Sequence, residues 1–319
     1  MRKAKYTTNK VIMKIYLNKP NESWVVDRFV KEWYEHNPDI STKNIKESDM
    51  IWLIAPWTWK KISKRQLKKK KVICTIHHID IDKFDKNEEK NFYNRDRYVD
   101  EYHSISGNTT NQLNKLTTKK ITTIPFWINQ DIFFSIEDKQ ILKNKYEVHP
   151  DSFLIGSFQR DTEGEDLISP KLSKGPDQFL EIVNYYHSVN KNLTVLLTGK
   201  RRNYLLKKLN ELNIEVKYFE MINFAELNEL YNILDLYVVA SRVEGGPQAI
   251  FECGLTKTPI ISTDVGIASE ILHKNSIFAM SNYKNAQPDV ETAFTNSIEY
   301  IIPDGFNLFM ELFSRNNEN

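Results

Sequence analysis

The sequence predicts an α/β protein of two domains, each a parallel sheet covered by helices. Short strand-like apolar runs alternate with amphipathic helical runs along the chain, which is typical of parallel sheets. The length of 319 residues corresponds to about two domains of about 150 residues each. Residues 125–150 carry prolines at both ends and are expected to connect the two. The predicted division is therefore 1–124, 125–150, 151–286 and a helical tail, 287–319.

Elements of the first domain are predicted from the period of the apolar residues. The helix expected at residues 24–34 places Val26, Phe29 and Trp33 on one face. The basic segment 1–10 lacks the uninterrupted apolar region of a secretory signal and is interpreted as a frayed tail. A further helix is expected at 108–116, and strands at 11–17, 50–55, 72–76 and 120–124.

The second domain repeats this alternation. Pro176 stands where a helix can begin, because its fixed φ and missing N–H cost least there. Asn223 and Glu226 have the spacing of a capping box and predict a helix at 225–234. The segment 289–313 is expected to be helical. Strands are predicted at 153–157, 193–198, 214–219, 236–240 and 258–263, with helices after Pro176 and around 205–212.

Composition excludes several classes of protein. Hydrophobic residues make up 40% and charged residues 27%, which excludes collagen-like chains and disorder of the whole chain. No apolar run reaches the ~18 residues that a membrane span needs. Cys74 and Cys253 lie in apolar surroundings, so we expect free thiols in a reducing, cytoplasmic compartment.

The most informative stretch runs from Ser241 to Gly254. A predicted strand enters a turn with Gly245 and Gly246, and Pro247 is expected at the first position of the next helix. The free N–H groups of that helix end and its dipole suit a phosphate or diphosphate. Those N–H groups belong to Gly246, Gln248 and Ala249.

Two carboxylates flank this helix start. Glu244 precedes the turn, and Glu252 follows it eight residues later, so both can face the phosphate-binding mouth. Carboxylates accept hydrogen bonds from hydroxyl groups. Phosphate binding beside hydroxyl acceptors is what a nucleotide sugar requires.

The stretch resembles the E-x7-E signature of retaining glycosyltransferases of family 4, glycosyl transferases group 1. Asp235, Glu270 and the strand and turn 258–266 match in register, and the resemblance covers about residues 72–272. It implies a GT-B fold, two Rossmann-like domains facing across a cleft, with a C-terminal helix returning toward the first domain. It also implies that Glu252 binds the ribose hydroxyls and that Glu244 lies near the donor sugar. No metal is expected on this reading, because the helix dipole together with an Arg and a Lys replaces it. No cofactor is expected either, because the UDP- or GDP-sugar is a substrate.

Relatives hold the diphosphate with an Arg-x4-Lys-Gly run. Here Arg160 and Lys174 are the matching residues, but 13 residues separate them instead of four. Lys171 is an alternative to Lys174, which we favour because Gly175 follows it. The acidic insert 161–166 is interpreted as a solvated face rather than a metal site.

The first domain offers a histidine at the end of a buried strand. By the resemblance His77 lies near the donor sugar in the cleft, with His78 as the alternative and Asp80 a weaker one. The glycine-rich turn expected after the first strand is replaced by 17–23, which leaves the acceptor class open. Trp127 is expected to pack at the domain junction. Trp52 is expected in the core, while Trp57 and Trp59 could stack on a sugar.

Charge is unevenly divided. Residues 1–124 hold 26 Lys and Arg against 15 Asp and Glu, a net +11, and residues 125–319 hold 18 against 27, a net −9. Eight of the twelve residues from Lys60 to Lys71 are basic. A solvated helix is the first interpretation of this run, an anionic membrane surface the second and nucleic acid the third.

These observations predict a retaining glycosyltransferase that moves a sugar from a nucleotide diphosphate to a glycan or lipid-linked acceptor. Synthesis of surface polysaccharide or glycoconjugate, at the cytoplasmic side of a membrane, is the expected setting. The alternatives are a nucleic-acid glycosyltransferase, a non-catalytic nucleotide-sugar binding module and an epimerase of the same fold.

Overall fold

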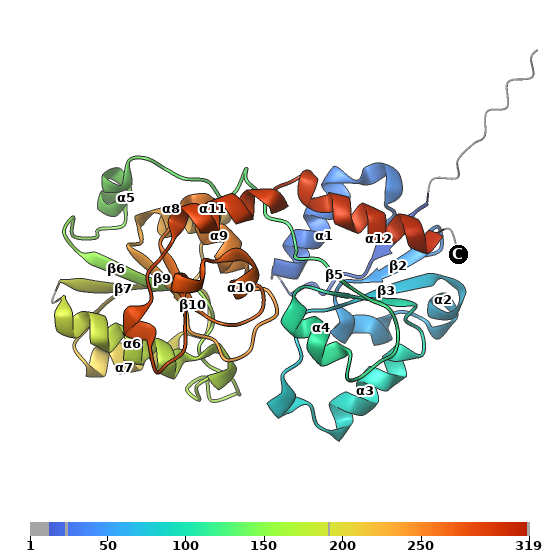
Figure 1. Ribbon diagram of the computed structural model, residues 1–319, viewed down its shortest axis with the longest axis horizontal. Coiled ribbons are helices and arrows are strands. Elements are labelled where there is room, and N and C mark those ends of the chain that lie inside the picture. Colours follow the sequence, from blue (N-terminus) through green and yellow to red (C-terminus); the bar gives the residue numbers. More distant parts are fainter. Residues whose placement is uncertain (1–12, 23–24, 191, 318–319) are drawn as a thin grey trace, which may run out of the picture.

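The computed structural model describes residues 13–22, 25–190 and 192–317, which form two α/β domains side by side (Figure 1). The predicted residues 11 and 12 of the first strand and the tail 1–10 lie outside the described residues. The first sheet is parallel, and its strands follow one another in chain order. They are β1 (Ile15–Leu17), β2 (Met50–Leu53), β3 (Lys71–Ile76), β4 (Glu101–Ser104) and β5 (Ile121–Thr123).

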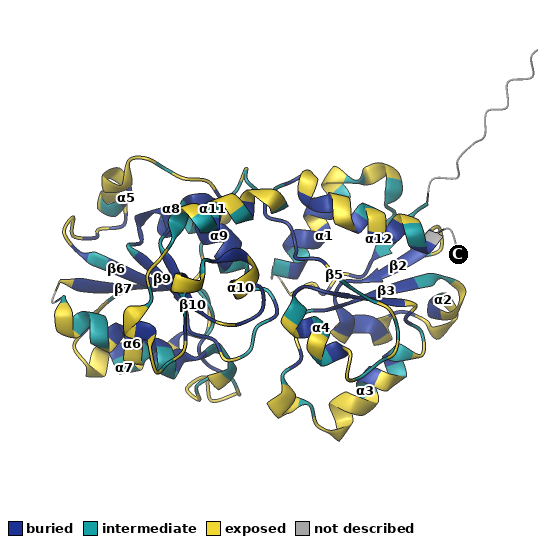
Figure 2. Ribbon diagram, in the orientation of Figure 1, coloured by how far each residue is buried: buried dark blue, intermediate teal, exposed yellow. Residues whose placement is uncertain are grey.

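Helices cover both faces of this sheet. One face packs against α1 (Val25–His36) and α12 (Asn307–Asn317) through a core rich in tryptophan and phenylalanine. The other face packs against α2 (Lys64–Lys69), α3 (Lys86–Asp96) and α4 (Gly107–Leu113). Strands β2, β3 and β4 are buried along nearly their whole length, because this double cover removes them from water, and Figure 2 draws their buried residues in dark blue.

The second sheet is also parallel, in the order β11-β10-β9-β6-β7-β8. Its direction of growth reverses between β6 and β9, which is the switch point of a doubly wound sheet. Ligands of such sheets bind at the carboxyl ends of the strands beside the switch point. The strands are β6 (Phe153–Ser157), β7 (Leu193–Thr198), β8 (Glu215–Phe219), β9 (Leu236–Val239), β10 (Ile260–Thr263) and β11 (Ile277–Phe278).

Local signals set several helix starts as expected. Pro176 is the first residue of α6 (Pro176–Val189), and Asn223 and Glu226 form the capping box of α8 (Phe224–Ile233). Pro247 differs from the prediction. It has an extended ψ of 111° and precedes α9 (Gln248–Thr256) instead of starting it. The remaining helices are α5 (Lys139–Lys145), α7 (Asn203–Glu211), α10 (Ala268–Ile271) and α11 (Val290–Ser297).

The C-terminal tail is not one continuous helix. Helix α11 packs on α9 of the second domain, and the chain then turns at Pro303 before α12 begins. Phe309, Leu312 and Phe313 of α12 insert into the core of the first domain. The expected return of the C-terminal helix to the first domain is therefore confirmed, and Figure 1 shows α11 and α12 on different domains.

Candidate active site at the domain junction

A cavity of about 720 Å³ lies between α1 of the first domain and the switch-point edge of the second. Six of the residues predicted from the sequence line it, and three others do not. Arg160, Gly245 and His77 lie outside its lining. The six that line it are Lys174, Glu244, Gly246, Gln248, Ala249 and Glu252.

The start of α9 presents unpaired backbone donors to this cavity. Pro247 accepts a bond from the N–H of Ile250 (3.0 Å), so α9 is anchored one turn in. The N–H groups of Gly246, Gln248 and Ala249 donate to no other atom of the described residues. Free N–H groups at a helix N-terminus attract negative charge, and here they do so at the switch point.

Glu252 forms the inner wall of the cavity. It is only 7% exposed, and its carboxylate accepts from the hydroxyl of Tyr231 (2.7 Å) and from Nη1 of Arg28 (3.2 Å). Arg28 comes from α1, and its Nη2 also donates to the amide oxygen of Gln248 (3.1 Å). The two domains are therefore joined by an ion pair at the position predicted to hold the ribose.

Arg28 is the main site residue that sequence reasoning missed. Its guanidinium is enclosed by aromatic rings, at 5.3 Å from the centroid of Phe133 and 5.5 Å from that of Phe224. In the sequence, the one feature that points to a paired Arg28 is Glu32, four residues later and beside the apolar face of the helix. Such pairs are usually solvent-exposed, so the spacing alone did not distinguish this one.

Glu32 ties α1 to the inter-domain connection. It accepts from the indole N–H of Trp127 (2.7 Å) and the amide of Asn129 (3.2 Å), while burial raises the pKa of its carboxyl against the opposing charge of Arg28. Trp127 is fully buried and packs against Phe306 of the C-terminal segment. The predicted packing of Trp127 at the junction is therefore confirmed.

Glu244 and Lys174 form an ion pair at the mouth of the cavity. Ser241 donates a second hydrogen bond to the same carboxylate oxygen (3.1 Å). Lys171 does not line the cavity; burial, and then the charges of Arg160 and Lys174, lower its pKa to about 8. The geometry brings Lys174, not Lys171, to the mouth of the cavity.

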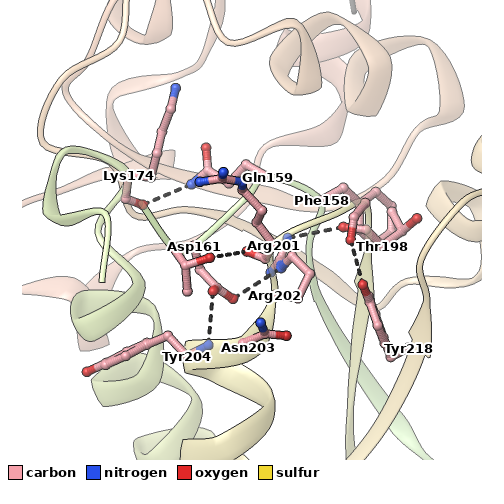
Figure 3. A network of polar contacts seen from close by, with 12 residues as sticks. Phe158, Gln159, Asp161, Lys174, Thr198, Arg201, Arg202, Asn203, Tyr204 and Tyr218 are labelled. Atoms are coloured by element: carbon pink, nitrogen blue, oxygen red, sulfur yellow. Dashed lines mark hydrogen bonds and ion pairs between the residues drawn. The ribbon is translucent and has the colours of Figure 1, made fainter. Parts of the chain in front are cut away.

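The acidic insert after β6 is partly built into the fold. Asp161 is 2% exposed and pairs with Arg202, Oδ2 to Nε at 3.2 Å, so the predicted solvated face does not hold for this residue. Burial raises the pKa of Asp161 to about 6, against the attraction of Arg202. Figure 3 shows this network, with the Lys174 side chain pointing away from it while its carbonyl accepts from Gln159 (3.0 Å).

The two histidines of the first domain have different surroundings. The Nε2 of His77 bonds to the carbonyl of Ile54 (2.7 Å), and its ring stacks on Phe126, so the imidazole is held on the first domain. Burial lowers its pKa to about 4. Partial desolvation lowers the pKa of His78, with Glu244 opposing and Lys174 adding to this shift. The charges of Glu244 and Lys174 thus influence the pKa of His78.

The backbone of Gly245 packs against the first domain at the end of β3. A Cβ added there would lie 1.4 Å from the carbonyl oxygen of His77, so only glycine fits. Gly245 therefore positions the Glu244 loop against the end of β3 and does not itself line the cavity.

Two further findings concern metals and membranes. Within residues 13–22, 25–190 and 192–317, no three His, Cys, Asp or Glu side chains are grouped to hold a metal ion. Over the same ranges, no helix has the length and apolar character to cross a membrane.

Comparison with known proteins agrees with this geometry. Residues 169–304 match the model of the family described as glycosyl transferases group 1. No curated protein matches the chain. The predicted resemblance to group 1 is thereby confirmed over the part of the chain that carries β9, α9 and β10.

Solved structures show the same fold along nearly the whole chain. HepE of Anabaena, described in complex with UDP and glucose, has a TM-score of 0.73 and 12% identity, covering 95% of this chain and 100% of its own. Sucrose-phosphate synthase of Thermosynechococcus elongatus has a TM-score of 0.67 and 14% identity, covering 91% and 76%. A glycosyltransferase of Rickettsia africae has a TM-score of 0.62 and 17% identity, covering 95% and 84%. The predicted GT-B architecture is therefore confirmed.

Proposed function

We propose that this chain, which has the GT-B fold and matches the glycosyl transferases group 1 model over residues 169–304, is a glycosyltransferase that transfers a sugar from a UDP- or GDP-sugar to a glycan or lipid-linked acceptor. The proposal rests on one observation. The free N–H groups of α9 and the ammonium of Lys174 face one cavity with the buried carboxylate of Glu252. The Anabaena structure with the same fold is described in complex with UDP-glucose, which supports a UDP-sugar as donor.

In this reaction the bond between the anomeric carbon and the leaving phosphate oxygen breaks, and the acceptor oxygen forms the new bond. Negative charge accumulates on the departing diphosphate. The N–H groups of α9 and the ammonium of Lys174 stabilise that charge because they are fixed before the reaction begins. Retention of configuration is proposed with attack from the same face, the leaving phosphate accepting the acceptor proton. We place Glu244 beside the donor sugar. The carbonyl of His77 contacts the loop that carries Glu244, at Gly245.

The donor proposal is tested by thermal unfolding with UDP-, GDP- and ADP-sugars. One nucleotide sugar is expected to raise the unfolding temperature, and Glu252→Gln is expected to weaken that stabilisation. Glu211→Gln is the matched control, because Glu211 is an exposed carboxylate paired with Lys208 (2.8 Å). If no nucleotide sugar stabilises the protein, the donor assignment is wrong.

The same titration tests whether Lys174 or Lys171 binds the diphosphate. We expect Lys174→Met to weaken donor binding about tenfold or more, because its charge lies at the mouth of the cavity. Lys171→Met is expected to have a small effect. The reverse order would assign the diphosphate to Lys171.

We further propose that the basic run from Lys60 to Lys71 contacts an anionic membrane. Six of its side chains are exposed, and none of the six pairs with a carboxylate of the described residues: Lys60, Lys61, Lys64, Arg65, Lys68 and Lys69. Figure 1 shows α2 at the end of the first domain remote from the second, so the run does not reach the donor cavity. Each such residue contributes about 1 kcal/mol near an anionic bilayer. Absence of binding to phosphatidylserine vesicles at low salt would contradict this, and binding to duplex DNA instead would favour the nucleic-acid alternative.

A further inference from the structure

A second cavity, of about 290 Å³, lies in the first domain between the end of β3 and α3. It shares no lining residue with the donor cavity. His77 and His78 form one wall, and Arg95 of α3 lies deep within it, at 7% exposure. The acidic residues of its lining, Asp80 and Glu88, are more exposed than Arg95. The deepest charge of this cavity is therefore positive.

Among the described residues, Arg95 has no counter-ion. No carboxylate of the described residues lies within 4.0 Å of its guanidinium, and its Nε is buried without a hydrogen-bond partner. Its neighbours are the ring of Phe92, with the centroid 5.4 Å away, and the thiol of Cys74, which burial keeps neutral by raising its pKa to about 11. A buried cation without a paired anion is costly, so a ligand that brings negative charge would be stabilised here.

The cavity also offers a hydrogen-bond donor and an aromatic face. The amide oxygen of Asn91 accepts from the indole of Trp59 (3.3 Å), which leaves the amide N–H groups of Asn91 free. Trp57 is 45% exposed and lies 5.6 Å, ring to ring, from His77. An exposed indole beside polar donors is a surface on which a sugar ring can stack.

The two cavities approach one another at the domain junction. The carbonyl of His77 meets Gly245 of the donor loop, and the charge of Glu244 acts on His78. Lys83, which lines the second cavity, pairs with Glu163 of the second domain (2.5 Å). A molecule in the second cavity would therefore lie next to the loop that holds the donor.

We propose that this second cavity binds an anionic group of the acceptor, a phosphate ester or a carboxylate, with Arg95 as its counter-ion. That the anion belongs to the acceptor rests on the proposed function, whereas the existence of an anion site does not. A phosphate ester and a carboxylate both bring negative charge to the buried guanidinium, and both can form paired hydrogen bonds with it. The substrate class is thus an acidic glycan or a phosphorylated acceptor, in place of a neutral sugar.

The test is calorimetric titration of the full chain with inorganic phosphate and, separately, with glucuronate, at ionic strength held constant with chloride. Asn91→Asp is the central variant, because it keeps the acceptor for Trp59 and places a negative charge in the cavity. We expect it to weaken anion binding about tenfold or more. Arg97→Gln, an exposed arginine two residues after Arg95, is the matched control and should leave binding unchanged. Glucose is the neutral control and should not bind.

A further variant separates this site from the donor site. Lys174→Ala removes one of the four basic side chains that line the donor cavity, the one that pairs with Glu244, and should leave the Asn91-sensitive binding intact. Binding of phosphate alone assigns a phosphate ester, and binding of glucuronate alone assigns a carboxylate. The inference is overturned if neither anion binds, if Asn91→Asp has no effect, or if Lys174→Ala abolishes the signal. Stabilisation of the Asn91→Asp protein by a nucleotide sugar tests the donor proposal independently, so the two failures are distinguishable.

Discussion

The ion pair between Arg28 and Glu252 predicts a strong energetic coupling between the two domains. Arg28→Met removes the charge but keeps most of the side-chain volume, and it leaves the Glu252 carboxylate buried with the Tyr231 hydroxyl as its neighbour. Glu252→Gln removes the opposite charge and keeps a side chain that can bond to Tyr231. The double variant removes both charges at once.

The structure gives the expected magnitude. The side chains of Arg28 and Glu252 are 5% and 9% exposed, so solvent screens the pair weakly. Two charges 3.2 Å apart attract by about 5 kcal/mol at an effective dielectric constant of about 20. Removing one partner of a buried pair typically costs about 3–5 kcal/mol, because the other charge stays buried. We therefore expect about 3 kcal/mol for Arg28→Met, and a double variant less destabilised than the sum of the single ones by about 2 kcal/mol.

Urea unfolding of the four proteins, followed by tryptophan fluorescence and circular dichroism, measures this coupling. The two signals must coincide for a two-state fit. Lys31 and Glu35 supply the matched control pair on the same helix, 3.7 Å apart with side chains 73% and 56% exposed. Their coupling should stay below about 0.5 kcal/mol. A coupling of Arg28 to Glu252 no larger than that of the control pair would refute the argument.

Three further changes test other parts of the structure. Burial lowers the pKa of His103 from 6.5 to about 3. The folded state therefore binds fewer protons than the unfolded state, and the free energy of unfolding decreases as the pH falls below 6.5. Between pH 6.5 and about pH 4.5 this decrease is about 2–3 kcal/mol. In the His103→Gln variant, measured by unfolding at the same pH values, this contribution should be absent. Gly245→Ala should lower the unfolding temperature by several degrees, because its Cβ would overlap the His77 carbonyl. Gly246→Ala should have a smaller effect, because its Cβ would meet only the side chains of Ile105, at 3.1 Å, and Ile267, and equal effects would contradict this. Asn223→Ala should cost about 1 kcal/mol in urea unfolding through loss of the cap of α8, and an unchanged midpoint would count against that bond.

Elements whose apolar period is clear were predictable from the sequence. The strand at 153–157 and the helix beginning at Pro176 are found at those residues. Strand β4 was missed because Glu101, His103 and Ser104 are polar yet buried. The carboxylate of Glu101 is bound by residues of the C-terminal helix, more than 200 residues away. A local sequence pattern cannot predict so distant a partner.

The sequence alone determined where the turn proposed to bind phosphate lies, because its two glycines, Pro247 and the eight-residue spacing of the two glutamates are local properties of one segment. It also determined the parallel α/β class. Tertiary structure alone decided that Arg28 pairs with Glu252, that His77 bonds to Ile54, and that Arg95 is buried with no carboxylate of the described residues beside it. The physical reason is that the cost of burying a charge depends on what surrounds it from every side, and those neighbours come from segments that only folding brings together.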